Sequence, residues 1–426
     1  MTNDIKQRIK QINNGRVPES YSHTKIGIFP DDWSVVSFDV KFNRLDRKND
    51  EDNQNVLTIS AQQGLISQQD YYNSSYASEN KKGYSLLYKG DFSYNKSYSG
   101  DYLYGAIKRL DKYEKGIVSP LYICFEPKDG TNSEFYLQYF EAGLFNGEIY
   151  KIAQEGARNH GLLNVSITDF FKTRLINPPC EEQKKIAEIL MQCDKVIELK
   201  QKRIEEEKEL KKALMQKLLN PDSGVRLPGF GGKWKKYTLG DVANIVSGGT
   251  PDTSNDLYWG GDILWCTPTD ITLSKKYIEN TQQKITKDGL NNSSATMLPV
   301  GTILMCSRAS IGPRAIAKVP ITTNQGFKSF VCKNHLNNEF FYYYIDIILN
   351  DFLKMSAGNT FKEISKSDIE RYIVLLPSIE EQRAIAKILS TKDDMIELLE
   401  QEVCEYKLKK KSLMQLLLTG IVRLQA

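Results

Sequence analysis

Two stretches of the chain, residues 178–219 and 377–418, carry apolar residues at alternating intervals of three and four. Of the ten positions that this spacing selects in each stretch, seven are apolar in the first and eight in the second. Such spacing places one apolar stripe along a helix and is typical of a coiled-coil seam. At ~1.5 Å per residue, about 40 residues form a helix about 60 Å long. The predicted seam residues are Ile186, Leu190, Ile197, Ile204, Leu214, Leu218, Ile385, Leu389, Ile396, Leu399, Val403, Leu413 and Leu417.

Both predicted helices have start and stop signals. Each follows a proline and has acidic residues in its first turn, where the helix dipole favours negative charge. The first ends at Asn220-Pro221 and the second at Thr419-Gly420, both of which break helices.

The two stretches are copies of one another. They align without a gap at an offset of 199 residues and share the landmarks Pro, Glu-Glu-Gln, Ile-Ala, Ile-Leu, Ile-Glu-Leu and Leu-Met-Gln, in that order. An isolated heptad stretch usually forms an oligomerisation stalk. Because these two helices are repeats within one chain, separated by a domain-sized segment, we expect them to pair with each other in antiparallel orientation.

A fainter repeat precedes each helix. Residues 25–33 resemble 227–234, and the tryptophan that ends each is followed five residues later by an apolar residue, Phe38 or Leu239. Residues 89–92 parallel 300–303, and residues 161–170 parallel 360–369. The predicted fold is therefore α/β (α+β), with two domains of mixed sheet and helix, two long helices and an internal pseudo-two-fold duplication. The predicted ranges are 1–20 (a helical segment), 21–176 (first domain), 177–224 (first long helix), 225–376 (second domain) and 377–426 (second long helix).

Composition excludes several classes of protein. The chain has 426 residues, of which 40% are hydrophobic and 26% charged, as in ordinary globular proteins. No run of eighteen apolar residues and no apolar signal segment are present, so we expect a cytoplasmic protein. Seven cysteines without a CxxC pair indicate neither a disulfide framework nor a zinc site. The net charge of +4 is only mildly suggestive of a polyanionic partner, and residues 1–176 are balanced, with 22 basic and 22 acidic side chains.

The first domain interleaves lysine with tyrosine in a way that suits phosphate and base-edge contacts. A solvated hairpin with tyrosine cross-strand pairs explains any single residue of this set equally well. A glycine-flanked Arg-Asn-His cluster is a sharper candidate, because a guanidinium can bridge guanine or phosphate. The candidates here are Lys81, Lys82, Tyr94, Lys96, Tyr98, Tyr102, Lys108, Arg109, Arg158, Asn159 and His160.

The second domain offers corresponding side chains. Asn and Gln can bind adenine with two hydrogen bonds, and Arg can bind guanine in the same way. The candidates are Ser307, Arg308, Arg314, Lys318, Asn324, Gln325, Lys328, Asn359, Thr360 and Lys362. Trp259 and Trp265 are expected to pack in the core, since reading a duplex does not require base stacking.

No catalytic residue, metal site or cofactor is predicted in this chain. Residues 177–180 read Asn-Pro-Pro-Cys, close to the Asn-Pro-Pro-aromatic motif with which amino-methyltransferases hold a flipped adenine. The aromatic ring is missing, and the segment runs directly into the first long helix. No glycine-rich fingerprint for a methyl donor, no Walker loop and no paired histidine is present.

The order of these features resembles the specificity subunits of type I restriction–modification systems over nearly the whole chain. The residues that carry the resemblance are Trp33 and Trp234, the turns Gly90-Asp91 and Gly301-Thr302, and the two Pro-x-x-Glu-Glu-Gln-x-x-Ile-Ala helix starts. Each motif is weak alone, but their order, repeated twice, is highly specific.

The resemblance implies a non-catalytic subunit in which each domain recognises one half of a bipartite, asymmetric site in double-stranded DNA. It implies that the long helices set the half-site spacing and dock two methyltransferase subunits, which use S-adenosylmethionine. It also implies separate restriction (motor) subunits, with ATP and Mg²⁺ on the partners. A short helix near residues 4–13 would pack near the C-terminal helix.

Two other classes remain open. A single-chain DNA methyltransferase or nuclease with divergent motifs would transfer methyl groups, or cut DNA, without partners. A coiled-coil scaffold protein would show no sequence preference for DNA even with the modification subunits present.

Overall fold

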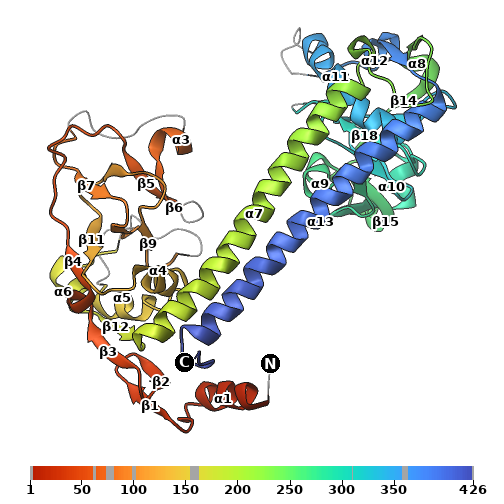
Figure 1. Ribbon diagram of the computed structural model, residues 1–426. Coiled ribbons are helices and arrows are strands. Elements are labelled where there is room, and N and C mark those ends of the chain that lie inside the picture. Colours follow the sequence, from red (N-terminus) through yellow and green to blue (C-terminus); the bar gives the residue numbers. More distant parts are fainter. Residues whose placement is uncertain are drawn as a thin grey trace. The chain divides into compact units, whose positions relative to one another are not determined.

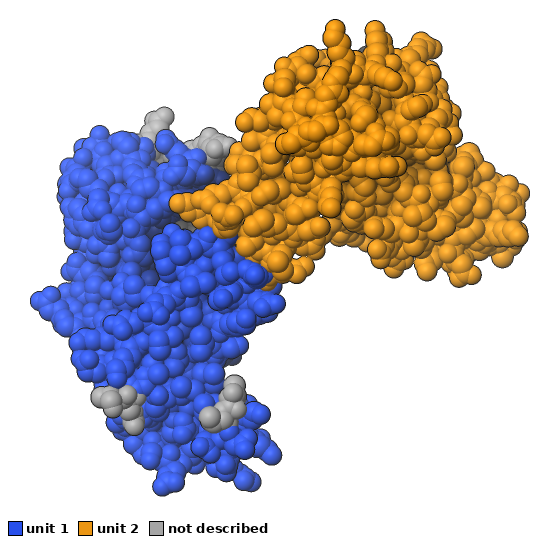
Figure 2. Space-filling model, turned by 45° about the vertical axis from the view of Figure 1, so that its right-hand side comes forward, with its two compact units in different colours: residues 1–200, 402–426 blue, residues 201–401 orange. Residues whose placement is uncertain are grey.

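The computed structural model describes residues 3–60, 64–72, 81–97, 102–153, 163–308, 310–356 and 363–424. They form two compact units, coloured separately in Figure 2: unit 1 contains Met1–Lys200 and Glu402–Ala426, and unit 2 contains Gln201–Gln401. The mixed helix-and-strand fold with two long helices is confirmed (Figure 1). The five predicted ranges assigned the long helices to regions of their own. The compact units instead each include half of either helix, because each half packs into the core of its domain. As domain boundaries, the five ranges remain a prediction.

Unit 1 is built on a four-stranded antiparallel sheet in the order β4-β11-β8-β9. Its shorter pairs are β1–β2, β3–β12, β5–β6 and β7–β10. The strands are β1 (Tyr21–Thr24), β2 (Gly27–Pro30), β3 (Ser34–Ser37), β4 (Phe42–Arg44), β5 (Leu57–Ser60), β6 (Gly64–Ser67), β7 (Ser85–Tyr88), β8 (Phe92–Asn95), β9 (Ala106–Arg109), β10 (Lys115–Val118), β11 (Ile123–Pro127) and β12 (Arg174–Asn177). The helices are α1 (Asn3–Asn13), α2 (Phe38–Lys41), α3 (Gln68–Tyr72), α4 (Ser133–Glu141), α5 (Asn146–Ile152) and α6 (Ile167–Phe171).

The core of unit 1 is a cluster of phenylalanine rings. Phe92 and Phe125, which are register partners on β8 and β11, stack with ring centroids 5.4 Å apart. Phe38 lies at the centre of the cluster, with ring centroids of six other phenylalanines between 4.8 and 6.2 Å away. Aromatic pairs at such separations add to the stabilisation by burial alone. This cluster therefore fixes the sheet against α4 and α6.

Unit 2 repeats this frame with an additional small sheet. Its main sheet has the order β14-β21-β18-β19-β16, and a second sheet has the order β17-β15-β20. The strands are β13 (Lys235–Thr238), β14 (Ala243–Ser247), β15 (Trp259–Cys266), β16 (Tyr277–Ile278), β17 (Gln283–Ile285), β18 (Ile303–Cys306), β19 (Arg314–Ala317), β20 (Thr322–Thr323), β21 (Phe327–Cys332) and β22 (Ile373–Leu376). The helices are α8 (Leu239–Val242), α9 (Pro268–Leu273), α10 (Lys287–Asn291), α11 (Asn338–Met355) and α12 (Lys366–Arg371), with the 3-10 turns η1 (Pro221–Ser223) and η2 (Asp256–Tyr258).

The faint repeats of the sequence mark the same joint in both units. The backbone N–H of Phe38 donates to Thr173 O, and that of Leu239 donates to Tyr372 O, each at 2.8 Å. These bonds continue the pairings of β3 with β12 and of β13 with β22. Each domain is thus closed where the chain enters and leaves it.

The long helices are α7 (Cys180–Leu218) and α13 (Ile379–Leu417), and they pair antiparallel within each unit (Figure 1). In unit 1, Asp194 is bonded to Lys410, and Lys200 to Glu402 further along α7. In unit 2, Glu207 pairs with Lys392, Lys208 with Glu400 and Lys211 with Asp393. Of the thirteen predicted seam residues, Leu214, Leu399 and Leu413 are half-buried and the other ten are buried. The seam thus contains charged pairs between its apolar layers.

An arginine after each long helix holds the start of the other. Arg423 binds both carboxylate oxygens of Glu182 through Nε and a terminal nitrogen, each at 2.9 Å. Arg226 binds both oxygens of Glu381 in the same way, with its Nε at 2.8 Å. We call these two pairs the clasps. They explain the second glutamate of the repeated Glu-Glu-Gln, since Glu182 and Glu381 occupy the same position of the repeat.

The glutamine of the same motif fastens each helix start to the preceding proline. The Nε2 of Gln183 donates to Pro178 O at 2.7 Å, and that of Gln382 donates to Pro377 O at 3.0 Å. Gln183 also donates to Asn177 Oδ1, so the Asn-Pro-Pro-Cys segment is bonded into a helix start.

The first helix α1 is amphipathic and contains no buried residue. The half-exposed Arg8 of this helix donates to Ile421 O at 2.5 Å and lies over the Tyr21 ring. Tyr21 in turn donates to Gly420 O. These contacts place α1 beside the segment that directly follows α13.

Candidate nucleic-acid interface

Four candidates of the second domain lie together at one end of its main sheet. Ser307 and Arg308 directly follow β18, and Asn324 and Gln325 directly precede Gly326 and β21. Because Cys306 on β18 faces Phe327 on the antiparallel strand β21, the end of one strand and the start of the other meet. We call this end of the sheet the reading edge.

Short polar contacts hold the reading edge in place. Ser307 donates to Gly326 O through its backbone N–H at 2.8 Å and through its hydroxyl at 3.1 Å. Asn324 accepts from the Gly326 N–H at 2.9 Å, and the Gln325 amide oxygen accepts from the Thr250 hydroxyl. A Cβ on Gly248 would lie 1.9 Å from Asn324 O, so only glycine fits there. The edge therefore presents amide and hydroxyl groups on a fixed backbone.

Charge at the reading edge is shared between two cations and one carboxylate. Glu363 lies between them, 3.2 Å from Lys328 Nζ and 3.5 Å from Arg308 Nε. The Lys328 side chain is 7% exposed and so belongs to the interior, whereas that of Arg308 is 47% exposed. Arg308 is thus the accessible cation of this pair. Asn359, Thr360 and Lys362, just before Glu363, lie outside the described residues.

The other two candidate cations of the second domain lie elsewhere. Arg314 is 9% exposed; it donates to Tyr342 O at 2.6 Å and pairs with Asp346 at 2.7 Å, which binds β19 to α11. Lys318 is exposed and lies 4.1 Å from the Tyr277 ring centroid. Since β19 runs antiparallel to β18, Lys318 lies at the opposite end of the sheet from Arg308.

The equivalent edge of the first domain is described in part. Lys96 directly follows β8 as Ser307 directly follows β18, and its carbonyl accepts from Leu163 N at 3.0 Å. Ser307 accepts from Ile364 N at 3.2 Å in the same arrangement. In both domains the segment before α6 or α12 thus reaches the same edge. Tyr98, Arg158, Asn159 and His160 lie outside the described residues.

Four candidates of the first domain form internal contacts. Tyr94 is 1% exposed and donates to Tyr104 O, and burial raises the pKa of its hydroxyl. Lys108 is buried, paired with Glu141 at 2.5 Å and 5.1 Å from the Tyr102 ring centroid. Arg109 is 10% exposed and bound to Asp111 and Glu134.

Lys81 and Lys82 lie outside that interior cluster. Lys82 is exposed, and the partly exposed Lys81 donates to Gln54 Oε1 at 2.6 Å. In unit 2, Trp265 is buried, donates to Gly249 O and meets Trp259 edge to face, so these two rings pack together as expected.

Sequence reasoning missed several residues that shape these sites. Thr250 and Glu363 lie at the reading edge, but a lone threonine and a lone glutamate gave no signal. The clasp arginines did leave one, because Val225-Arg226-Leu227 and Val422-Arg423-Leu424 repeat the same three residues after each long helix.

The polar groups at the reading edges suit binding to DNA. Among the described residues, no group of three or more His, Cys, Asp or Glu side chains is placed to hold a metal ion. The helices of the described ranges include none with the length and apolar character needed to cross a membrane. What the reading edges present are guanidinium, ammonium, amide and hydroxyl groups, the chemistry that contacts phosphates and base edges.

Known proteins share this organisation. The family model described as the type I restriction modification DNA specificity domain matches residues 37–209 and again residues 231–405. The MjaX specificity subunit of Methanocaldococcus jannaschii, named as putative, is 27% identical over 96% of this chain and 97% of its own length. The MjaIX specificity subunit of the same organism is 40% identical, over 38% of this chain and 39% of that relative.

Two solved structures show the same fold. An S subunit from M. genitalium aligns with a TM-score of 0.52 at 14% identity, over 94% of this chain and 98% of its own. A chain from a structure of the type I R-M system, described by its complex assembly and conformational transition, aligns with a TM-score of 0.58 at 18% identity, over 92% of this chain and 99% of its own. The resemblance inferred from the sequence is confirmed: with two matches that together span most of its residues, this chain belongs to the type I restriction–modification DNA specificity family.

Proposed function

We propose that this chain is the DNA-sequence-specificity subunit of a type I restriction–modification complex, acting in the cytoplasm without catalytic residues of its own. The observation that carries the proposal is the double match to a DNA specificity domain, at residues 37–209 and 231–405. Two domains with one frame and different reading edges suit a bipartite, asymmetric site in double-stranded DNA. Within this proposal, residues 21–176 and 225–376 are the two DNA-recognition domains, and residues 1–20, 177–224 and 377–426 are the helical segments.

The accessible candidates at these two edges are the proposed contacts. In unit 2 these are Arg308 and Gln325 at the reading edge, and in unit 1 Lys96 at the equivalent edge. Arginine can bind guanine O6 and N7, glutamine can bind adenine, and lysine suits phosphate. The candidates outside the described residues, Tyr98, Arg158, Asn159, His160, Asn359, Thr360 and Lys362, adjoin these edges in sequence and belong to the same proposal.

The long helices offer a surface for partner subunits. Leu199 on α7 is 53% exposed and Leu398 on α13 is 56% exposed, and they are equivalent residues of the repeat. Leu199 belongs to unit 1 and Leu398 to unit 2. Because these exposed leucines occupy the same repeat position, two copies of one partner would meet the same residue in each unit. We assign these positions to two methyltransferase subunits, which bring S-adenosylmethionine; the restriction subunits would bring ATP and Mg²⁺.

The test is a methylation map of the genome before and after deletion of the gene. Loss of adenine methylation at one split motif is the expected result. Exchange of residues 225–376 for those of a relative should then alter one half of the motif and leave the other unchanged. An unchanged methylome in a strain with active modification subunits would contradict the proposal.

Two alternatives have direct tests of their own. Methyl transfer, or DNA cleavage, by the purified chain without partners would favour a single-chain methyltransferase or nuclease. DNA binding without sequence preference in the presence of the modification subunits would favour a coiled-coil scaffold.

Replacement of Arg308 by alanine should weaken binding of the cognate site, because this guanidinium is the accessible cation of the reading edge. One base or phosphate contact of this kind is worth about 1–3 kcal/mol, or roughly a 5- to 150-fold rise in Kd. The measurement is a competition gel shift with the assembled complex. Lys287→Ala, an exposed lysine of α10 outside the candidate set, is the matched control; equal losses in both variants would contradict the assignment.

A further inference from the structure

In unit 1, one carboxylate joins three elements. Asp194 on α7 accepts from Lys410 of α13, whose Nζ lies 2.6 Å from Oδ1 and 2.7 Å from Oδ2. It also accepts from Gln138 of α4, whose Nε2 lies 2.8 Å from Oδ2. Gln138 is 2% exposed and the Lys410 side chain 13%. A single side chain therefore connects the recognition domain with both long helices.

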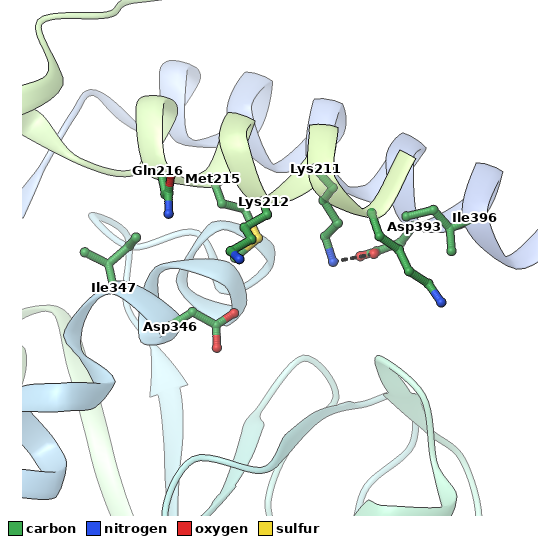
Figure 3. A pocket seen from close by; sticks show the side chains of 9 residues that line it. Lys211, Lys212, Met215, Gln216, Asp346, Ile347, Asp393 and Ile396 are labelled. Carbon is green, nitrogen blue, oxygen red and sulfur yellow. Dashed lines mark ion pairs between the residues drawn. The ribbon is translucent and has the colours of Figure 1, made fainter. Parts of the chain in front are cut away.

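Unit 2 contains the same junction. Asp393 on α13 accepts from Lys211 of α7, with 2.5 Å between Nζ and Oδ1. The Tyr343 hydroxyl of α11 donates to Asp393 Oδ2 at 2.5 Å. Figure 3 shows Lys211 reaching from α7 to Asp393, beside a pocket of about 490 Å³ that Asp346 and Ile347 of α11 also line. The Nζ of Lys211 also lies over the Tyr343 ring, 5.3 Å from its centroid.

The two junctions are equivalent residue by residue. Asp194 and Asp393 are 199 positions apart, and so are Lys211 and Lys410, which is the offset of the helix repeat. Gln138 and Tyr343 each lie six residues after the asparagine that caps their helix, Asn132 or Asn337. The Gln138 amide in one domain and the Tyr343 hydroxyl in the other thus make equivalent hydrogen bonds to equivalent aspartates of the helix repeat. Two domains that otherwise differ in sequence both have this contact.

Such a junction controls geometry more than the apolar seam can. Burial of leucine and isoleucine is non-directional, whereas a hydrogen bond depends on angle and distance. Polar residues at seam positions specify register, and the half-buried Lys211 and Lys410 occupy such positions. A slip of one heptad would move Lys410 or Lys211 by about 10 Å along its partner helix and break both junctions. A rotation of either domain about the helices would break its bond from Gln138 or Tyr343.

We propose that Asp194 and Asp393 are positioning residues that set the angle of each recognition domain on the paired helices, and thereby the spacing of the two DNA half-sites. This inference rests on the proposed function, since it requires that the chain read a bipartite site. Neither carboxylate touches DNA in this scheme. Each acts through the domain that it holds.

The test is a spacer series. The assembled complex methylates duplexes in which the two half-sites, taken from the methylation map, are separated by the natural number of base pairs or by one or two more or fewer. The measured quantity is the spacing ratio, which is the methylation rate at the natural spacing divided by the rate at the neighbouring spacings. Asp194→Asn and Asp393→Asn should each lower this ratio by about tenfold, which corresponds to the loss of one charged hydrogen-bonding contact. Glu198→Gln is the control, because this carboxylate pairs only with exposed Lys195 of the same helix among the described residues.

The outcomes are distinct. Lower rates with an unchanged spacing ratio would show that the carboxylates merely stabilise the fold, and would overturn the inference. Wild-type complex that methylates all spacings equally would instead contradict the proposed function.

If the single variants do not fold, the exchange D194K with K410D decides. It keeps one charge of each sign at the junction, and the Oε1 of Gln138, which has no hydrogen-bond partner among the described atoms, can accept from the lysine. Recovery of the wild-type spacing ratio is expected. A folded exchange variant with a relaxed ratio would overturn the inference.

Discussion

Replacement of Glu182 by glutamine is expected to destabilise unit 1 by about 3–5 kcal/mol, the usual consequence of removing one partner of a buried ion pair. The Glu182 side chain is 4% exposed and accepts from Arg423, from the Trp33 indole at 2.8 Å and from Leu424 N at 3.0 Å. Glutamine can accept at one oxygen only and brings an amide toward the guanidinium. Urea denaturation followed by circular dichroism measures the change.

Two controls separate the clasp from general effects on the helix start. Glu181→Gln changes the neighbouring carboxylate, which is 70% exposed and pairs with Lys184, and should cost under about 1 kcal/mol. Glu381→Gln breaks the second clasp. Its effect should be smaller than that of Glu182→Gln, because the Trp234 indole makes no hydrogen bond within the described residues. Equal effects of Glu181→Gln and Glu182→Gln would contradict this account.

The clasp also predicts an acid limit of stability. Burial alone would raise the pKa of Glu182, but its bonds from Arg423, Leu424 and Trp33 outweigh burial, and the pKa falls below its ordinary value of 4.5. A carboxyl group with a lowered folded-state pKa stabilises the fold above its unfolded pKa, and that contribution disappears as pH falls through the folded value. Wild-type stability should therefore decline below about pH 4.5 more steeply than that of the Glu182→Gln variant.

The sequence predicted the elements whose signal is periodic. The long helices, their antiparallel pairing and ten buried seam residues follow from the spacing of residues such as Ile186 and Ile385, because a helix face repeats in register with its pattern. The clasps and junctions could not be derived in the same way. Glu182 pairs with Arg423 across 241 positions, and the Val-Arg-Leu motif repeated after each long helix does not by itself identify the partner of its arginine.

The candidate contacts were harder to predict for a related reason. Lysine and arginine among tyrosines suit DNA, but they equally suit an interior ion pair. Lys108 and Arg109 form ion pairs with Glu141 and Glu134 of α4. Arg314 forms an ion pair with Asp346 of α11. Only the fold decides between the two environments. The repeated turns Gly90-Asp91 and Gly301-Thr302 lie five residues before Lys96 and Ser307, which occupy equivalent edges of the fold, but the sequence alone did not identify either edge.

Replacement of Phe38 by alanine is expected to destabilise unit 1 by about 3–5 kcal/mol. The side chain is fully buried and lies among six other phenylalanine rings, the closest being Phe170 at 4.8 Å between centroids. Alanine would leave a cavity that these rigid rings cannot collapse to fill. Phe38 also lies at the closing bond to Thr173, so the damage should reach both ends of the domain.

Hydrogen exchange distinguishes this effect from global loss of structure. Phe38→Ala should increase exchange in residues 21–176 and in the adjoining ends of α7 and α13, with little change in residues 225–376, because the cores of the two units have no residue in common. Phe38→Leu, which keeps most of the volume, should cost under about 1.5 kcal/mol. The matched variant Leu239→Ala removes the equivalent residue of unit 2 and should produce the reverse pattern, with a cost of about 2–5 kcal/mol. Increased exchange in both domains after either substitution would show that the two cores unfold together, and would contradict the description of two separately packed units.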